Sequence, residues 1–249
     1  MIGLLRSEFL KIRSVRSNVI MAIAAVVMPL GSVVLVAMLT GLENIDNTTI
    51  QGVLGAAAPV SVLLYGIVGV LCIAQEYSQS TIRLTLAATP NRYVAYFAKL
   101  LVIVFASALL MGISTLGASV AGKSILTSRG FTGELTHPQS SASLAAMIVI
   151  AAMSGVLGVG LGAITRNPPS AITILLLWPL LVEILVGNIV AQVFSRNILD
   201  WLPFGTAIQA MFLDVEGLRF GRWGATGYFG IWVTVLVVIG QVIFVRRDA

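Results

Sequence analysis

The stretch that decides the fold is Ser143–Thr165, SLAAMIVIAAMSGVLGVGLGAIT, which contains no charged side chain. A helix of about 20 residues, rising 1.5 Å per residue, crosses the ~30 Å hydrocarbon core of a bilayer. Its apolar residues are continuous rather than confined to one stripe, so no face of this helix suits water. We therefore predict that it spans a membrane.

Five more stretches have the same length and apolar character. They are Asn18–Thr40, Val53–Ala74, Val94–Ala121, Ala171–Phe194 and Ala225–Val245. Of the 249 residues, 58% are hydrophobic and 10% are charged, and the mean hydropathy is +1.00. A soluble domain carries roughly 25% charged residues. The expected fold class is all-α: a polytopic membrane protein whose six transmembrane helices form one domain over residues 1–249.

The segments between these spans carry charge unevenly. With a cytoplasmic N-terminus, ten of the 15 Lys and Arg residues lie inside, namely Arg6, Lys11, Arg13, Arg16, Arg83, Arg92, Lys99, Arg166, Arg246 and Arg247. The other five lie outside, namely Lys123, Arg129, Arg196, Arg219 and Arg222. This is the direction of the positive-inside rule. We expect a multi-pass protein of the cell (plasma) membrane with both termini cytoplasmic, in contact with lipid and with no nucleic-acid partner.

Three segments outside the spans have informative patterns. In residues 1–17 apolar and basic side chains interleave at helical spacing, which predicts an interfacial helix on the cytoplasmic leaflet. Residues 75–93 form the longest cytoplasmic loop and have the composition of a short helix closed by Thr89-Pro90. Residues 197–224 are half apolar and interrupted by Gly and Pro. They fit either a re-entrant pair of short external helices or a surface loop.

One motif matches a nucleotide-binding pattern letter for letter. Gly117, Gly122, Lys123 and Ser124 satisfy G-x-x-x-x-G-K-S. That chemistry needs a strand before the loop and a helix after it, within an α/β domain. Here the residues end the third span on the outer face, where there is no ATP. We interpret the match as a coincidence and expect no cofactor, no metal and no catalytic residue in this chain.

Glu183 is the most informative single side chain, because it lies near the middle of the fifth span, one turn after Trp178 and Pro179. A carboxylate at that depth costs at least ~2.5 kcal/mol and normally faces protein or water. Pro179 also leaves one backbone carbonyl without its helical hydrogen bond. Two roles stay open. Either these three residues line a substrate path, or Glu183 is structural, protonated or paired with Asn188, Gln192 or a neighbouring helix.

The fourth span carries small residues at four-residue spacing, Ser154, Gly158 and Gly162. Small residues on one face let two helices approach closely in a membrane. We expect this face to pack against another helix of the chain rather than to line a pore.

The loop after the second span and three other stretches share a family resemblance. The stretches are Glu76-Tyr77-Ser78-Gln79-Ser80-Thr81-Ile82-Arg83, then Thr89-Pro90-Asn91-Arg92 and Lys99, together with Leu5–Arg13, Leu177–Glu183 and Trp201–Phe204. They resemble the permeases of type II ABC exporters, the drug, lipid and polysaccharide family, over effectively the whole chain. Ser80 and Asn91 depart from the pattern, which often has a glycine and a second basic residue there.

The resemblance implies a transport permease rather than an enzyme. Such a subunit provides the substrate path of an ATP-driven exporter, while ATP and magnesium bind a separate soluble ATPase. Two copies of this ATP-binding cassette subunit and a second permease chain, identical or homologous, complete the transporter. The implied ATPase-coupling residues are Phe9, Lys11, Glu76, Tyr77, Arg83, Pro90 and Arg92. The resemblance also favours re-entrant helices in residues 197–224.

Two other functions fit the residues alone. One is a proton-coupled secondary transporter that uses Glu183, although we detect no internal repeat of the kind common in such folds. The other is a non-transporting membrane scaffold or a self-protection protein. Copurification of a soluble ATPase would favour the exporter over both.

The predicted topology has a direct test. Single cysteines are placed at Ser7 and Ser128 in a Cys72→Ser background, and intact cells are treated with a membrane-impermeant thiol reagent. We expect labelling at position 128 and none at position 7, because the basic loops face the cytoplasm. Labelling of position 7 alone would overturn the topology.

Overall fold

The computed structural model describes residues 2–194, 201–213 and 219–246. It is 87% helical, and the described residues contain no strand. Six helices are long and apolar enough to span a membrane, namely Arg16–Leu39 (α2), Thr49–Ser78 (α3), Arg92–Ser128 (α5), Ser140–Thr165 (α6), Pro168–Val190 and Gly221–Arg246 (α10). The predicted all-α fold with six spans is therefore confirmed.

Shorter helices join these spans. They are α1 (Ile2–Ser14) before α2, the 3₁₀ turn η1 (Leu42–Asn44) after α2, α4 (Ile82–Ala88) between α3 and α5, and α9 (Pro203–Met211) before α10. Helices α1 and α4 occur where the sequence predicted short helices. The position of α1 on a leaflet stays a prediction.

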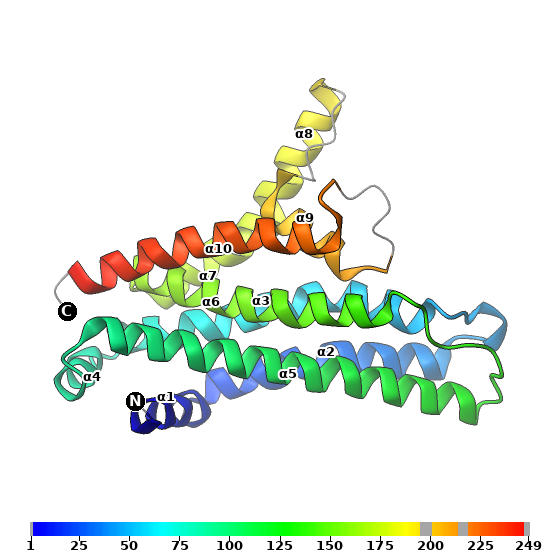
Figure 1. Cartoon of the computed structure of the whole chain (residues 1–249), viewed down its shortest axis with the longest axis horizontal. Coiled ribbons are helices and arrows are strands. Elements are labelled where there is room, and N and C mark those ends of the chain that lie inside the picture. The colour runs from blue at the N-terminus through cyan, green and yellow to red at the C-terminus, as the bar shows by residue number, and fades with distance from the viewer. Residues whose placement is uncertain (1, 195–200, 214–218, 247–249) are drawn as a thin grey trace.

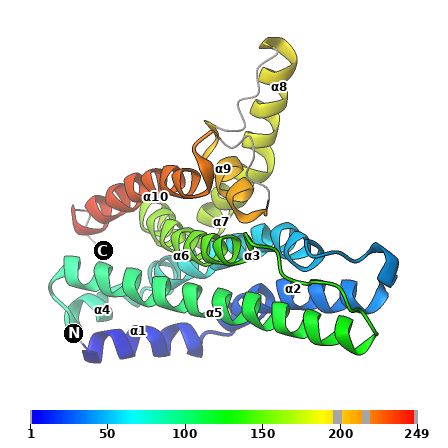
Figure 2. The ribbon, with the colours of Figure 1, turned by 45° about the vertical axis from the view of Figure 1, so that its right-hand side comes forward.

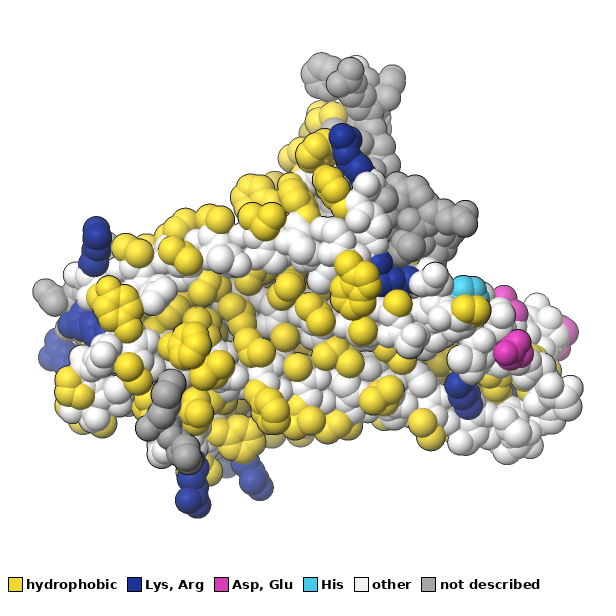
Figure 3. Space-filling view, in the orientation of Figure 1, with side chains coloured by type: hydrophobic (Ala, Val, Ile, Leu, Met, Phe, Trp, Pro, Cys, Tyr) yellow, Lys and Arg dark blue, Asp and Glu magenta, His cyan; other side chains and the backbone are white. Residues whose placement is uncertain are grey.

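The spans α2, α3, α5, α6 and α10 run lengthwise beside one another, as Figure 1 shows. Both chain ends, α1 and α4 lie at the same end of this bundle. Figure 3 shows Lys and Arg side chains gathered at that end, and acidic side chains at the other. We call the end that holds α1 and α4 the basic end.

Apolar side chains cover the visible face of the bundle between its two ends (Figure 3). Large ones such as Leu39, Phe105 and Ile231 are more than half exposed. A soluble monomer rarely exposes apolar patches this extensive, whereas a hydrocarbon environment requires them. The surface therefore agrees with residence in a bilayer.

The closest contact in the bundle is between α3 and α6, and small residues permit it. A methyl group at Gly158 would overlap the carbonyl oxygen of Gly66, and one at Gly69 would overlap the carbonyl oxygen of Gly155. The Ser154 hydroxyl donates a hydrogen bond of 2.7 Å to the Val62 carbonyl. The small residues predicted to pack against another helix do so, and their partner is α3.

Helices α3 and α5 extend furthest beyond the predicted spans. Helix α3 continues to Ser78, so Glu76 and Tyr77 lie on a helix rather than on a loop. Helix α5 continues to Ser128 and ends where Gly130 adopts a φ of +95°. Backbone hydrogen bonds from Gly130 to Thr127 and from Phe131 to Leu126 satisfy its last carbonyls. At these ends the backbone stays helical although the residues are less apolar than those of the spans.

The fifth span contains a π-helical turn. Helix α7 (Pro168–Leu177) passes into η2 (Trp178–Glu183), which is followed by α8 (Ile184–Phe194). Pro179 has no backbone N–H, and a π-turn accommodates that loss with one extra residue per turn. Helix α8 then projects away from the other spans (Figure 2).

Part of the segment 197–224 can be compared with its prediction. Helix α9 packs against α10, α6 and α3, and Phe204, Ala207 and Met211 are buried. Residues 197–200 and 214–218 lie outside the described residues, as do the predicted topology charges Arg196 and Arg247. Re-entry of this segment into the membrane stays a prediction.

The contact between α3 and α6 predicts a stability difference between two glycine substitutions. Gly158→Ala should lower the free energy of unfolding by about 1–3 kcal/mol, because the methyl group forces the helices apart. Gly52→Ala on α3 is the control, since nothing lies within 4 Å of the added methyl group. Thermal unfolding in micelles measures both. Equal melting temperatures for the two variants would contradict this packing.

Candidate functional site

Four charged side chains from three helices meet at the basic end. Lys99 of α5 contacts Glu8 of α1 at 2.6 Å and Glu76 of α3 at 2.7 Å. Lys11 of α1 contacts the same two carboxylates at 2.7 and 2.9 Å. It also donates to the Thr85 hydroxyl of α4 at 3.1 Å. We call Glu8, Lys11, Glu76 and Lys99 the ion-pair cluster.

Three members of the ion-pair cluster are almost fully removed from solvent, whereas the Lys11 side chain is 43% exposed. Lys99 is 0% exposed and Glu8 is 1% exposed. An unpaired charge at such a site is strongly destabilising, but here two ammonium groups and two carboxylates balance each other. The cluster forms only when α1, the end of α3 and the start of α5 come together. It therefore fixes the mutual positions of these three helices.

Helix α1 buries one acidic side chain and exposes apolar as well as basic residues, including Arg6 and Arg13. Glu8 faces the protein, while the neighbouring Phe9 and Leu10 are about half exposed. A helix on a water-facing surface has the opposite arrangement. Exposed apolar and basic residues on one short helix are compatible with the interfacial position, which stays a prediction.

Two arginines hold the end of α10 beside the ion-pair cluster. Arg92 donates to the Val245 carbonyl at 3.1 Å, and Arg166 donates to the Ile243 carbonyl at 3.4 Å. Cations near a helix C-terminus offset its partial negative charge. The Arg166 guanidinium also lies 4.8 Å from the centre of the Tyr77 ring.

The seven predicted coupling residues therefore fall into two groups. Glu76, Lys11, Tyr77 and Arg92 make contacts within the chain, as just described. The remaining three are exposed at the basic end, namely Phe9, Arg83 and Pro90. We had expected the charge of Glu76 to meet a partner protein, and its carboxylate instead meets Lys11 and Lys99. Its role in coupling stays a prediction, now through the fold rather than by direct contact.

Glu183 caps the N-terminus of α9. Its carboxylate accepts hydrogen bonds from the backbone N–H groups of Phe204 and Gly205, at 3.1 and 2.8 Å, and from the Trp178 indole at 3.1 Å. Backbone N–H groups in the first turn of a helix have no partner inside the helix, and the helix dipole favours a negative charge there. These contacts, and not Asn188 or Gln192, satisfy the buried carboxylate.

The other end of α9 is held by a positive charge. Arg222 of α10 is buried and donates to the carbonyls of Ala210, Phe212 and Leu213, at 3.0, 2.8 and 3.1 Å. Helix α9 is thus fixed by an anion at its start and a cation at its end. Of the two roles open for Glu183, the structural one accounts for the three hydrogen bonds just described. The role of Trp178, Pro179 and Glu183 in a substrate path stays a prediction.

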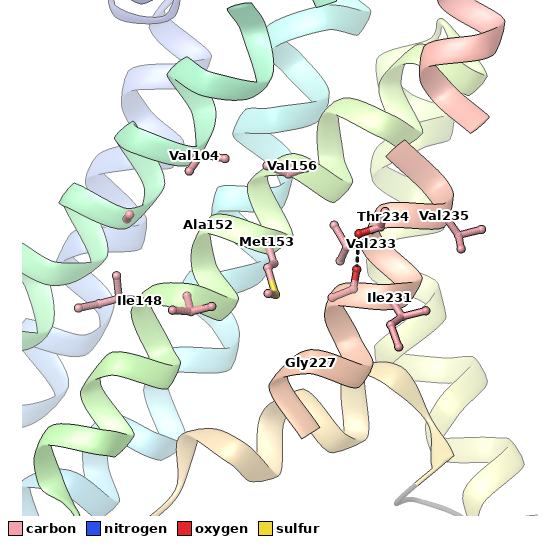
Figure 4. A pocket seen from close by; sticks show the side chains of 13 residues that line it. Val104, Ile148, Ala152, Met153, Val156, Gly227, Ile231, Val233, Thr234 and Val235 are labelled. Atoms are coloured by element: carbon pink, nitrogen blue, oxygen red, sulfur yellow. Dashed lines mark hydrogen bonds between the residues drawn. The ribbon is translucent and has the colours of Figure 1, made fainter. Parts of the chain in front are cut away.

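The predicted path residues line two small apolar cavities beside α9. Trp178 lines one of about 240 Å³, and Pro179 and Glu183 line another of about 180 Å³. A larger apolar groove of about 780 Å³ lies elsewhere, between α5, α6 and α10. Figure 4 shows its lining, with Met153 pointing toward α10 and Thr234 hydrogen-bonded within α10. None of the three predicted residues lines this groove.

The nucleotide-like motif lies entirely within α5. Gly122 is buried against Val33 and Ile50, and Lys123 donates to the Thr136 hydroxyl at 2.8 Å. The N–H groups of a helix interior bond to carbonyls four residues earlier, so they do not form a phosphate-binding loop.

A comparison with protein-family models identifies the family of this chain. A model described as "ABC-2 family transporter protein" matches residues 4–182, from α1 into η2. This chain belongs to the ABC-2 transporter family. A comparison with curated proteins found no match.

As an ABC-2 permease, the chain is a multi-pass membrane component of transport and not itself an enzyme. Permeases of this family generally work with an ATPase subunit. All four members of the ion-pair cluster lie within the matched residues, whereas Glu183, α9 and α10 lie beyond them.

Three residues whose side chains hold the short helices of this ABC-2 permease in place were not singled out from the sequence. Glu8 gave one signal, its place one helical turn before Lys11, but its partner Lys99 is 91 residues away. Thr85 and Arg222 gave none, because each bonds to groups that only the folded chain brings near.

The ion-pair cluster predicts that Lys99 is essential for stability. Lys99→Met leaves two buried carboxylates with Lys11 alone and should lower the free energy of unfolding by about 3 kcal/mol. Lys123→Met, on the same helix, is the control because Lys123 lies outside the cluster and bonds a single threonine. Unfolding in micelles measures both. A similar small effect of the two substitutions would contradict the buried pairing.

The two roles of Glu183 predict different effects of its substitutions on stability and on transport. As a cap, Glu183→Leu should destabilise the permease by about 1–2 kcal/mol, and Glu183→Gln should cost less because it keeps one acceptor oxygen. As a path residue, Glu183→Gln should change transport and its pH dependence at normal stability. Transport by Glu183→Gln that matches the parent across roughly pH 6 to 8, where buried carboxylates titrate, would exclude the path role.

Proposed function

We propose that this chain is the membrane-spanning permease subunit of an ATP-driven exporter, and that it docks a separate ATPase with α1 and α4. The observation that supports this most strongly is the ion-pair cluster. It connects two short helices at the basic end to the ends of two spans, through contacts of 2.6 to 3.1 Å. A partner that moves these short helices would also move the spans.

The docking surface is formed by the exposed side of α4 and of α1. Leu84 is 72% exposed and lies next to the exposed Arg83. A leucine and an arginine side by side suit a partner with an apolar pocket and an acidic rim. On α1, Phe9 and Leu10 extend the apolar part of the surface.

Contacts between side chains connect α4 to the spans α3 and α5. Thr85 on α4 accepts a hydrogen bond from Lys11, and Lys11 contacts Glu76 at the end of α3. Glu76 in turn contacts Lys99 on α5. Just before α4, the Thr81 N–H also donates to the Glu76 carbonyl at 2.9 Å, and Ile82 of α4 is buried. Movement of α4 together with the ends of α3 and α5 keeps these contacts, whereas separate movement breaks them.

The complete transporter contains two permease chains and two ATPase subunits, with ATP and magnesium bound by the ATPase. It resides in the cell membrane with the basic end in the cytoplasm. Support comes from the family, whose permeases generally work with an ATPase subunit, and from the basic residues at the end that holds both termini.

Replacement of one exposed docking residue should separate ATP hydrolysis from transport. Arg83→Ala should weaken ATPase association or reduce transport per ATP, without loss of membrane insertion, because Arg83 faces solvent and supports no internal contact in the structure described. The measurement is copurification of a soluble ATPase, followed by ATP turnover and transport in proteoliposomes.

Lys123→Ala is the matched control, since it removes a basic residue from the end of α5 that lies away from the basic end. It should leave ATP turnover nearly unchanged. Wild-type coupling in Arg83→Ala, and in its double variant with Leu84→Ala, would place the docking surface elsewhere. Transport that stops with a proton uncoupler but survives ATP depletion would contradict the ATP-driven mechanism itself.

A further inference from the structure

A second cluster of side chains, apolar rather than charged, joins α4 to the last turns of α10. Ile82 of α4, Tyr96 of α5 and Phe244 of α10 belong to it, and Tyr77 of α3 packs against it. The first three are at most 3% exposed. We call these four residues the α10 joint. It is distinct from the larger apolar core, which contains the outer half of α10.

Phe244 is held by aromatic rings from the two spans that carry the ion-pair cluster. Its ring centre lies 6.5 Å from that of Tyr77 on α3, edge to face, and 5.5 Å from that of Tyr96 on α5. Both distances are those of favourable aromatic pairs. The Tyr96 hydroxyl also donates to the Val237 carbonyl of α10 at 3.1 Å. These contacts tie the end of α10 to α3 and α5.

The α10 joint and the ion-pair cluster occupy neighbouring positions on the same two helices. On α3, Glu76 contacts Lys99 in the cluster, and the next residue, Tyr77, meets Phe244. On α5, Lys99 follows Tyr96 by about one helical turn. Consecutive residues of a helix point about 100° apart, so one turn of α3 reaches both groups. A shift of this end of α3 therefore acts on the cluster and on the joint together.

Arg166 supports the joint from the end of α6. Its φ of +55° lies in the left-handed region, where glycine or asparagine is usual at a helix end because other side chains are disfavoured. The guanidinium of Arg166 lies 4.8 Å from the centre of the Tyr77 ring and donates to the Ile243 carbonyl of α10. Backbone strain of this kind persists where the surrounding contacts impose it. Here those contacts hold Tyr77 and α10 together.

Helix α10 borders two of the apolar spaces described above. Side chains within residues 227–236 line both the groove of about 780 Å³ and the cavity of about 240 Å³, and Val233 lines both. Protein interiors are otherwise close-packed, so a helix beside such spaces can shift with less repacking than a tightly enclosed one. A displacement of α10 changes the shape of both spaces.

We propose that Phe244 is a positioning residue that makes α10 follow α4, so that a displacement of α4 reshapes the groove and the cavity beside α10. The proposal rests on the proposed function in one respect, namely that an ATPase displaces α4. The connection runs through the buried apolar contacts of the joint, in parallel with the ion pairs that connect α4 to α3 and α5. The sixth span then converts movement at the basic end into a change of shape within the membrane.

The test is a double-mutant cycle between α4 and α10 in the purified full chain in micelles. Ile82→Ala removes the α4 side chain from the joint, and Phe244→Leu removes the ring but keeps an apolar side chain. Hydrogen exchange, followed by mass spectrometry, is measured for residues 237–246 in the parent, the two single variants and the double variant. We expect each single substitution to speed exchange about tenfold, and the double variant to exchange about fivefold more slowly than the product of the two effects.

Two controls separate the joint from a general loosening of the protein. Leu84→Ala also truncates an aliphatic side chain of α4, but Leu84 is 72% exposed, so exchange at the end of α10 should stay unchanged. Exchange of residues 25–39 in α2, which lie outside the joint, corrects for opening of the whole chain. If Phe244→Leu does not fold, Tyr77→Leu takes its place in the cycle. Tyr77→Phe, which keeps the ring, should then behave like the parent.

Single effects that multiply within about twofold would overturn the proposal, because the two helices would then open independently. An equal response of α10 to Leu84→Ala and to Ile82→Ala would overturn it as well. The cycle needs no ATPase, so its outcome is separate from that of the docking test. If α4 and α10 are coupled in the cycle but Arg83→Ala leaves transport per ATP unchanged, the joint stands and only the docking surface is wrong.

Discussion

Two ammonium groups and two carboxylates packed together at the basic end constrain the rest of this fold. Lys99 and Glu8 are withdrawn from solvent, and removal of either one leaves the cluster with one charge that has no counter-charge. Helix α1 must therefore stay against α5, and the end of α3 must stay against both. The close glycine contact of α3 with α6 then positions the next span, and Arg92 and Arg166 attach the end of α10.

The same principle operates at another short helix, α9. Helix α9 is a brief helix between two spans, and its exposed backbone ends would be costly within a membrane. Glu183 supplies an anion at its start and Arg222 a cation at its end. Charges deep in this ABC-2 permease thus serve to satisfy other charges or backbone groups.

The spans were predictable from sequence because the bilayer imposes one requirement on length and apolarity, which residues 143–165 meet without any reference to their neighbours. The packing of Gly158 was predictable for a similar reason, since small residues at helical spacing act locally. Partners far along the chain were not predictable. Glu8 meets Lys99, and Glu183 meets backbone N–H groups of Phe204 and Gly205 that carry no sequence signature. The extension of α5 to Ser128 likewise depended on a glycine conformation rather than on hydropathy.

The most direct test of the central claim is a double-mutant cycle between Glu8 and Lys99. The free energy of unfolding is measured for the parent, Glu8→Gln, Lys99→Met and the double variant. If the two residues are a buried pair, each single variant leaves the cluster with one uncompensated charge, whereas the double variant keeps it neutral. The double variant should therefore lose about 1.5–3 kcal/mol less than the sum of the two single losses. Losses that add within about 0.5 kcal/mol would show that the residues act independently, and would contradict a fold held together at this cluster.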